Sequence, residues 1–185
     1  MWWREGGASG VARLTVVVAA AALLAGCFQP LYGERSLTGN PTVRDSLSSV
    51  SVAQIAALDG TYEARLAVQI RNDLLFNFTG GGEPRPQTHR LQVQMTGGRT
   101  IVMLDANTAL PSAESYGLNA SYSLTEIATG KIVLKGSAVS TVSYDPPGAQ
   151  RFARIAALGD AERRAAKVIS ENITTRLASY FNSGT

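Results

Sequence analysis

The stretch LNASYSLTEIATGKIVLKGSAVSTVSY, residues 118–144, decides the fold of this chain. Apolar and polar side chains alternate on both sides of Thr129-Gly130, which is the period of a strand with one buried face. Two such runs joined by a short glycine-containing connection predict a β-hairpin. The side chains predicted to point into the core are Leu118, Ala120, Tyr122, Leu124, Ile132, Leu134, Ala138, Val142 and Tyr144.

A strand and a helix are predicted ahead of this hairpin. Residues 48–56 have the short apolar pattern of a strand. Thr61 can cap a helix whose apolar residues recur at spacing four, and Gly80 predicts its end after Thr79. The predicted apolar stripe of this helix is Tyr62, Leu66, Ile70, Leu74 and Phe78.

A further strand is predicted over residues 91–103. Leu91, Val93 and Met95 alternate with polar residues, and Gly97-Gly98 suggests a bend or bulge. We expect Ile101 and Met103 to resume the same buried face after that bend. A loop is expected around residues 107–114, with Glu114 and the other loop carboxylates solvated.

The last element is a helix for which Asp160 resembles an N-cap. Its apolar stripe is Ile169, Ile173, Leu177 and Phe181. Residues 151–158 fit either a separate short helix or a docked loop. The order of strand, helix, three strands and helix predicts an α+β two-layer sandwich, with one mostly antiparallel four-stranded sheet and two helices on one face.

The N-terminus has the organisation of a secretory signal peptide. Arg4 and Arg13 precede an apolar run from Leu14 to Ala25, which is shorter than the roughly 20 residues that a spanning helix needs. The run ends at Cys27, the only cysteine in the chain, so no internal disulfide can form. Leu24-Ala25-Gly26-Cys27 matches the lipobox of bacterial lipoproteins, in which the cysteine is acylated and becomes the first residue. An inert buried cysteine is the alternative.

These features divide the chain into three parts. Residues 1–26 are predicted to be a lipoprotein signal peptide, residues 27–47 a lipidated N-terminus and tether, and residues 48–185 a single α+β domain. Several acyl chains on one residue would anchor the domain at a membrane surface. Phe28 stands where lipoproteins retained in the inner membrane often carry Asp, which favours an outer-membrane location.

Catalysis, metal binding and nucleic-acid binding are not expected. His89 is the only histidine and has the position of a partly exposed loop or edge residue; with Cys27 committed to lipid, no metal-ligand cluster remains. The covalent lipid on Cys27 is the only non-protein group expected. A formal net charge of +3 is too small to argue for nucleic-acid binding.

The sequence leaves surface binding as the source of function. Asn119, Ser121, Ser123 and Thr125 give the hairpin a short, polar outward face. Four basic residues lie at or near strand ends and could bind anionic phosphates, although ordinary solubilising charge is the more common explanation: Arg90, Arg99, Lys131 and Lys135.

Three segments resemble one known family. Cys27-Phe28-Gln29-Pro30-Leu31-Tyr32-Gly33 resembles the C-G-F-x-P-L-Y start of the LPS-assembly lipoproteins, the LptE family, without the glycine that usually follows the cysteine. Ile70 to Leu75 is similar to the "lrn-L" helix of that family, and Asp160 to Ala165 is similar to the start of its final helix. The order of elements is also similar over the whole mature domain.

The resemblance implies a non-enzymatic role. Members of the family plug the outer-membrane β-barrel LptD, help it to assemble, and bind lipopolysaccharide on its way to the outer leaflet. The domain would then lie at the periplasmic side of the outer membrane, held by the lipid on Cys27. Two alternatives remain: a lipid-anchored adaptor or pilot protein for another envelope complex, and a lipid-anchored hydrolase that depends on His89.

Overall fold

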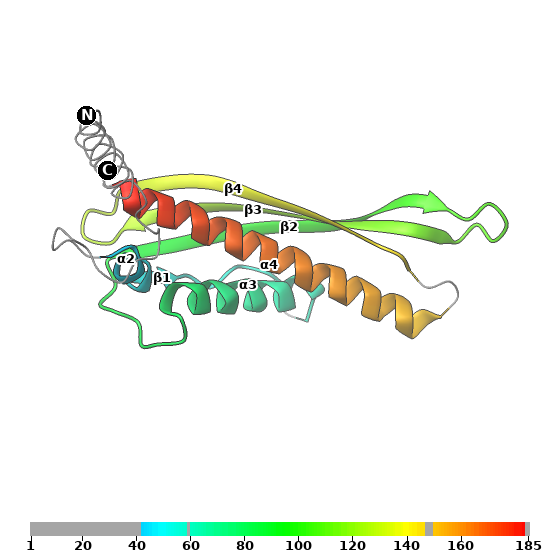
Figure 1. Cartoon of the computed structure of the whole chain (residues 1–185), viewed down its shortest axis with the longest axis horizontal. Helices are drawn as coiled ribbons and strands as arrows, with labels where there is room; N and C mark the ends of the chain where they lie inside the picture. Colours follow the sequence, from blue (N-terminus) through cyan, green and yellow to red (C-terminus); the bar gives the residue numbers. More distant parts are fainter. Residues whose placement is uncertain (1–41, 59, 147–149, 184–185) are drawn as a thin grey trace, which may run out of the picture.

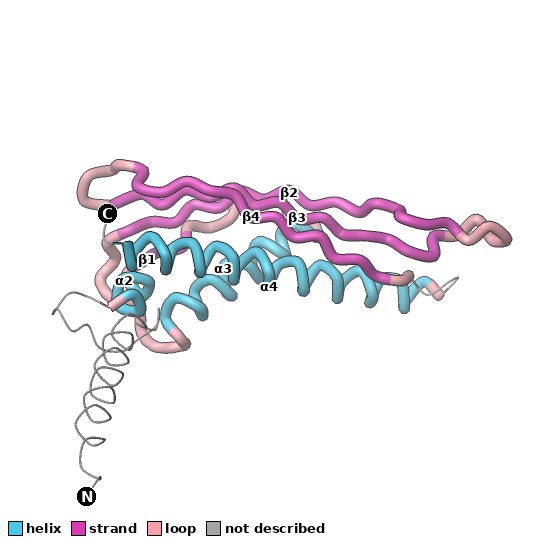
Figure 2. Tube along the Cα trace, turned by 45° about the horizontal axis from the view of Figure 1, so that its top comes forward, coloured by secondary structure: helices cyan, strands magenta, loops and turns pink. Residues whose placement is uncertain are grey.

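The computed structural model describes residues 42–58, 60–146 and 150–183 and has an α+β fold. One four-stranded sheet has the order β1-β2-β3-β4, and the helices pack on one of its faces (Figures 1 and 2). The strands are β1 Val50–Val52, β2 His89–Leu104, β3 Pro111–Glu126 and β4 Ile132–Tyr144. Only the β1–β2 pair is parallel, so the predicted mostly antiparallel two-layer sandwich is confirmed.

The hairpin of β3 and β4 forms as the alternation predicts. Gly130 adopts a φ of 68°, and the backbone N–H of Glu126 donates to the carbonyl of Lys131 at 2.9 Å to close the turn. The inward residues of β3 are buried, whereas Ile132 at the start of β4 is 51% exposed. The two strands stay in register from Glu114 opposite Tyr144 to Leu124 opposite Leu134.

Helix α3 spans Tyr62–Thr79, within the predicted limits. The Thr61 hydroxyl accepts a hydrogen bond from the Ala64 N–H at 3.2 Å, and Gly80 ends the helix in the left-handed conformation at φ 63°. The predicted stripe is buried from Leu66 to Phe78, while Tyr62 at the first position is exposed.

Helix α4 is one continuous helix, Arg151–Ser183, so the predicted start at Asp160 is wrong, as are both alternatives for residues 151–158. Inside the helix the Asp160 carboxylate accepts a hydrogen bond from Arg164 Nε at 2.8 Å. This ion pair satisfies a side chain that would otherwise favour a cap, which explains how the helix passes through it. The buried side chains of α4 recur in adjacent pairs every four residues, from Ala161-Glu162 to Leu177-Ala178.

A short helix that the sequence analysis missed precedes β1. Helix α2, Val43–Ser48, occupies the end of the predicted tether, and Leu47 is buried in the core. Thr42 and Asp45 form a capping box, with the Asp45 N–H donating to the Thr42 hydroxyl at 3.1 Å. The T-x-x-D spacing was the available signal. The predicted signal peptide, Cys27 and the rest of the tether lie outside the described residues.

Two tyrosines of β3 lie flat across glycines of neighbouring strands. The Tyr122 ring covers Gly136 on β4, and a Cβ at position 136 would lie 2.5 Å from the tyrosine hydroxyl oxygen. Tyr116 covers Gly97 on β2 in the same manner. Each glycine therefore provides the space that a buried aromatic ring needs.

The layers are unequal in length (Figure 1). One end of the molecule, the proximal end, holds α2, β1, the β3–β4 turn and the C-terminal turns of α3 and α4. At the other end, the distal end, the β2–β3 hairpin extends beyond the helices, and only the first turns of α4 accompany the sheet. With 16 residues in β2, the sheet is about 50 Å long.

Candidate interaction surfaces

The face of the sheet that no described helix covers is mostly polar, although Val139, which is opposite Asn119, is 60% exposed on it. Its side chains alternate with the buried set in each strand and are mostly short and uncharged: Gln92, Gln94, Thr96, Asn119, Ser121, Ser123, Thr125, Ser137, Thr141 and Ser143. Such a surface can form many hydrogen bonds while it offers little apolar area, so it suits a polar or hydrated partner.

Three of the four basic residues proposed from the sequence to bind phosphates lie at the proximal end. Arg90 is opposite Thr125 and Lys135 is opposite Ser123, so both belong to the polar face, and Lys131 lies in the β3–β4 turn. Two strand spacings separate β2 from β4, which places Arg90 and Lys135 roughly 10 Å apart across the sheet. Together they can form charge-assisted hydrogen bonds to an anionic group such as a phosphate.

Arg99 lies apart from these three. It is nine residues further along β2, about 30 Å from Arg90, and it shares the helix-covered side with Val93. Its positive charge instead opposes the rise in the pKa of Tyr144 and of Glu162 that burial causes. Burial raises the pKa of Glu162, and the guanidinium groups of Arg65 and Arg99 oppose that rise.

Beneath the first turns of α4 lies a buried polar cluster that the sequence analysis did not identify. Glu114 was expected in a solvated loop, but β3 begins three residues earlier and turns its carboxylate inward, where the residue is 6% exposed. The Tyr144 hydroxyl donates to Glu114 Oε2, and Arg154 Nη2 lies 3.6 Å from Oε1. Burial and the Glu114 carboxylate raise the pKa of Tyr144 to about 12. The alternation of Ala113, Ser115 and Gly117 with larger residues was the signal for this strand.

His89 lies at the start of β2 in a chain of hydroxyl groups. Its Nδ1 is 2.8 Å from the Thr88 hydroxyl oxygen, which is 2.8 Å from that of Ser49, and its ring packs edge-on against Phe181. Burial lowers the pKa of His89, and the charge of Glu126 opposes this shift. These contacts join the end of α2, the start of β2 and α4. Within the described ranges, no three or more His, Cys, Asp or Glu side chains are arranged to hold a metal ion.

The distal end carries an apolar surface that was not predicted. Ile101, Val102, Met103 and Leu104, here called the distal knob, are each 56–61% exposed, so the expectation that Ile101 and Met103 would be buried is wrong. Register shifts between residues 101 and 104 turn these side chains in different directions, and α3 does not reach this far (Figure 1). Four consecutive exposed apolar residues are typical of an interaction surface.

The loop at the apex of the distal knob is polar. Asp105 Oδ1 accepts hydrogen bonds from the Asn107 and Thr108 N–H groups at 3.0 and 2.8 Å and from the Thr108 hydroxyl. These bonds lower the pKa of Asp105. The charged apex would resist entry into hydrocarbon, so the knob fits a partner that surrounds it and leaves the apex in water.

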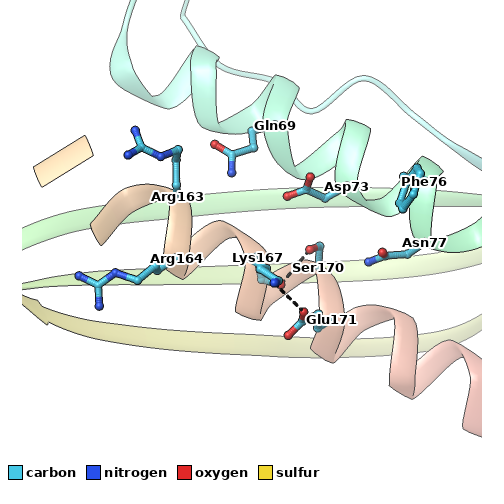
Figure 3. A pocket seen from close by; sticks show the side chains of 9 residues that line it. All are labelled: Gln69, Asp73, Phe76, Asn77, Arg163, Arg164, Lys167, Ser170 and Glu171. Carbon is cyan, nitrogen blue, oxygen red and sulfur yellow. Dashed lines mark hydrogen bonds and ion pairs between the residues drawn. The ribbon is translucent and has the colours of Figure 1, made fainter. Parts of the chain in front are cut away.

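A groove of about 400 Å³ separates α3 from α4 on the side away from the sheet (Figure 3). Gln69 and Asp73 of α3 face Arg163 and Lys167 of α4 across it. Lys167 lies 3.9 Å from Glu171 on its own helix, and burial raises the pKa of Asp73. The lining holds three basic and two acidic side chains, and Arg163 and Arg164 also pair with Asp160, so the groove carries little charge excess to select an ion.

No described helix is long and apolar enough to cross a membrane. The fold and surfaces therefore define a small α+β domain with one polar sheet face, a cationic proximal end and an apolar distal end.

Solved structures of bacterial lipoproteins share this fold. A candidate lipoprotein from Caulobacter crescentus superposes with a TM-score of 0.58 at 20% identity, covering 77% of this chain and 97% of that one. Rare lipoprotein B from Shewanella oneidensis has a TM-score of 0.52 at 12% identity, covering 73% and 96%. Lipoprotein B from Nitrosomonas europaea has a TM-score of 0.53 at 12% identity, covering 82% and 95%. Neither a protein-family model nor a curated protein sequence matches the chain.

Proposed function

We propose that this chain is an outer-membrane lipoprotein that plugs the LptD β-barrel, helps it to assemble, and binds lipopolysaccharide during its passage to the outer leaflet. The polar sheet face carries the proposal. It is about 50 Å long, close to the roughly 40–45 Å thickness of a membrane with its headgroups. The lumen of a large outer-membrane barrel is polar and hydrated, and an uncovered sheet face rich in Ser, Thr, Asn and Gln complements it.

The anchor in this proposal is a lipid on Cys27, at the periplasmic side of the outer membrane. The lipobox and the shared fold with solved lipoproteins support it. The role is non-enzymatic and needs no cofactor beyond that lipid.

Lipopolysaccharide contact is assigned first to the proximal cations Arg90, Lys131 and Lys135. They are close enough to meet one phosphorylated headgroup, whereas Arg99 lies about 30 Å from Arg90 on the helix-covered side of the sheet and is not part of this assignment. Both lysines are exposed, and exposed ion pairs contribute about 0.2–1 kcal/mol each, so losing the two lysines should weaken binding about tenfold.

The first test is an affinity pull-down of the full chain through a C-terminal tag in mild detergent. We expect a stable one-to-one complex with a β-barrel of far greater mass, and loss of that barrel's assembly when the chain is depleted. Normal barrel assembly without the chain would overturn the proposal.

The second test separates lipopolysaccharide binding from barrel binding. In displacement of fluorescent lipopolysaccharide, Lys131→Ala with Lys135→Ala should weaken binding about tenfold. Lys167→Ala, an exposed lysine on α4, is the matched control and should leave binding unchanged. Equal losses in the two variants would contradict the assignment of the proximal cations.

One observation favours the adaptor as a second candidate. Among the described strands, none pairs with the β1 side of β2 beyond Leu91, which leaves an open edge that a partner strand could extend. The same pull-down decides, because an adaptor would recover a secretin or a peptidoglycan-associated protein in place of the barrel.

A further inference from the structure

We infer that residues 151–158, the first two turns of α4, form a flap that leaves the distal end of the sheet by a hinge at Gly159 and Asp160. The inference does not depend on the proposed function. Burial is uneven along α4. Ten side chains are buried between Ala161 and Ala178, and none is buried between Arg151 and Asp160. Segments with few buried contacts open locally at low free energy.

The residues at the boundary suit a hinge. Glycine inside a helix favours the helical state less than alanine does. A Cβ at position 159 would meet Arg163 Nη1 at 3.6 Å, an ordinary contact, so packing does not require glycine there. Asp160 can act as an N-cap for the remainder of the helix by exchanging its ion pairs with Arg163 and Arg164 for a backbone N–H.

Few contacts hold the flap closed. Arg154 Nη2 lies 3.6 Å from Glu114 Oε1, and Ala157 and Leu158 are partly buried against the core. On the outer side Phe152 is 87% exposed and Ile155 is 50% exposed. Glu114 keeps the Tyr144 hydroxyl as a partner when Arg154 leaves, so opening does not leave a buried carboxylate without a donor.

Opening would change the distal surface. It withdraws Arg154 from the sheet and exposes the residues beneath the flap, next to the distal knob. The buried sides of Ala157 and Leu158 would then join the exposed Phe152 and Ile155. The flap therefore controls how much apolar surface the distal end presents to a partner.

Hydrogen–deuterium exchange of the full chain in mild detergent tests this inference. The first four N–H groups of any helix lack helical acceptors, so the informative amides are those of residues 155–162. We expect them to exchange at least tenfold faster than the amides of residues 169–178. Either local melting of the flap or a kink at the hinge would expose amides within residues 155–162.

Two variants locate the hinge. Gly159→Ala should slow exchange of residues 155–162 about fivefold, equivalent to about 1 kcal/mol. Asn172→Ala, an exposed position of the same helix with a comparable gain in helix propensity, should leave that segment unchanged. Protection of residues 155–162 equal to that of residues 169–178 would overturn the flap, and equal effects of the two variants would overturn the hinge.

Discussion

Replacing Gly136 with alanine tests whether Tyr122 fixes the packing of the β3–β4 pair. The new Cβ would lie 2.5 Å from the Tyr122 hydroxyl oxygen and 2.7 Å from the ring carbon that bears it. Both distances are well below ordinary van der Waals contact, so the ring must move. Tyr122 is 6% exposed and packs in the core, which leaves it little space to move into.

The expected loss of stability follows from overpacking. Forced shifts of a buried side chain typically destabilise a protein by about 1–3 kcal/mol. A loss of about 2 kcal/mol should lower the melting temperature of a chain of this size by about 4–8 °C. Thermal unfolding of the full chain in mild detergent, followed by circular dichroism, measures the shift.

Gly98→Ala is the matched control on the same sheet. No atom lies within 4 Å of a Cβ at Gly98, and its φ is in the ordinary range. Alanine there restricts the unfolded chain and should stabilise by up to about 1 kcal/mol. In a Tyr122→Ala background the Gly136→Ala change should become nearly neutral, since the clashing ring is gone. Equal losses at both glycines, or no coupling to Tyr122, would refute this account of the packing.

Three further predictions concern the distal half. Tyr144→Phe removes the hydroxyl donor of buried Glu114 and should destabilise by about 1–3 kcal/mol in urea unfolding, whereas an unchanged midpoint would contradict the hydrogen bond. Burial raises the pKa of Glu162 above its ordinary 4.5, so its contribution to stability is present below that pH and is lost as pH rises through the folded-state value. Glu162→Gln should therefore be more stable than the parent chain at pH 7 in urea unfolding, with a difference that vanishes below about pH 4, and a constant difference would count against it. Ile101→Ser with Met103→Ser should leave the melting temperature within about 1 °C because both side chains are already exposed, yet should weaken capture of the β-barrel in the pull-down; unchanged capture would remove the distal knob from the interface.

The elements that sequence reasoning predicted correctly have their signals within a few residues of each other. Thr61 and Gly80 limit α3 through contacts at spacings of three and four, and the alternation from Leu118 to Leu124 decides which side of β3 faces the helices. The ends of α3 and the orientation of β3 depend on local backbone chemistry and on one buried face.

The predictions from sequence were wrong where residues far apart in the chain decide the local structure or its burial. Gly159 and Asp160 have the composition of a helix boundary, but ion pairs with the next turn satisfy Asp160, and the helix continues. Ile101 has the parity of a buried strand residue, but α3 starts too far along the sheet to cover it. The burial of Glu114 depends on Tyr144, thirty residues away, and no local pattern contains that partner.

The proposed lipid anchor on Cys27 would not by itself orient the domain. Thr42 is fifteen positions after Cys27, and a fully extended chain of that length would reach about 50 Å, which equals the length of the sheet. Either end of the domain can therefore face the membrane as far as the tether is concerned, and orientation must come from the surfaces that bind partners. The proximal cations and the distal knob lie at opposite ends and differ in chemistry, so one partner that engages both would fix the sheet along a single direction. A barrel that contacts the polar face over its whole length satisfies this requirement. A partner strand added to the edge of β2 would pair with its backbone but leave the side chains of the distal knob exposed on both faces of the sheet.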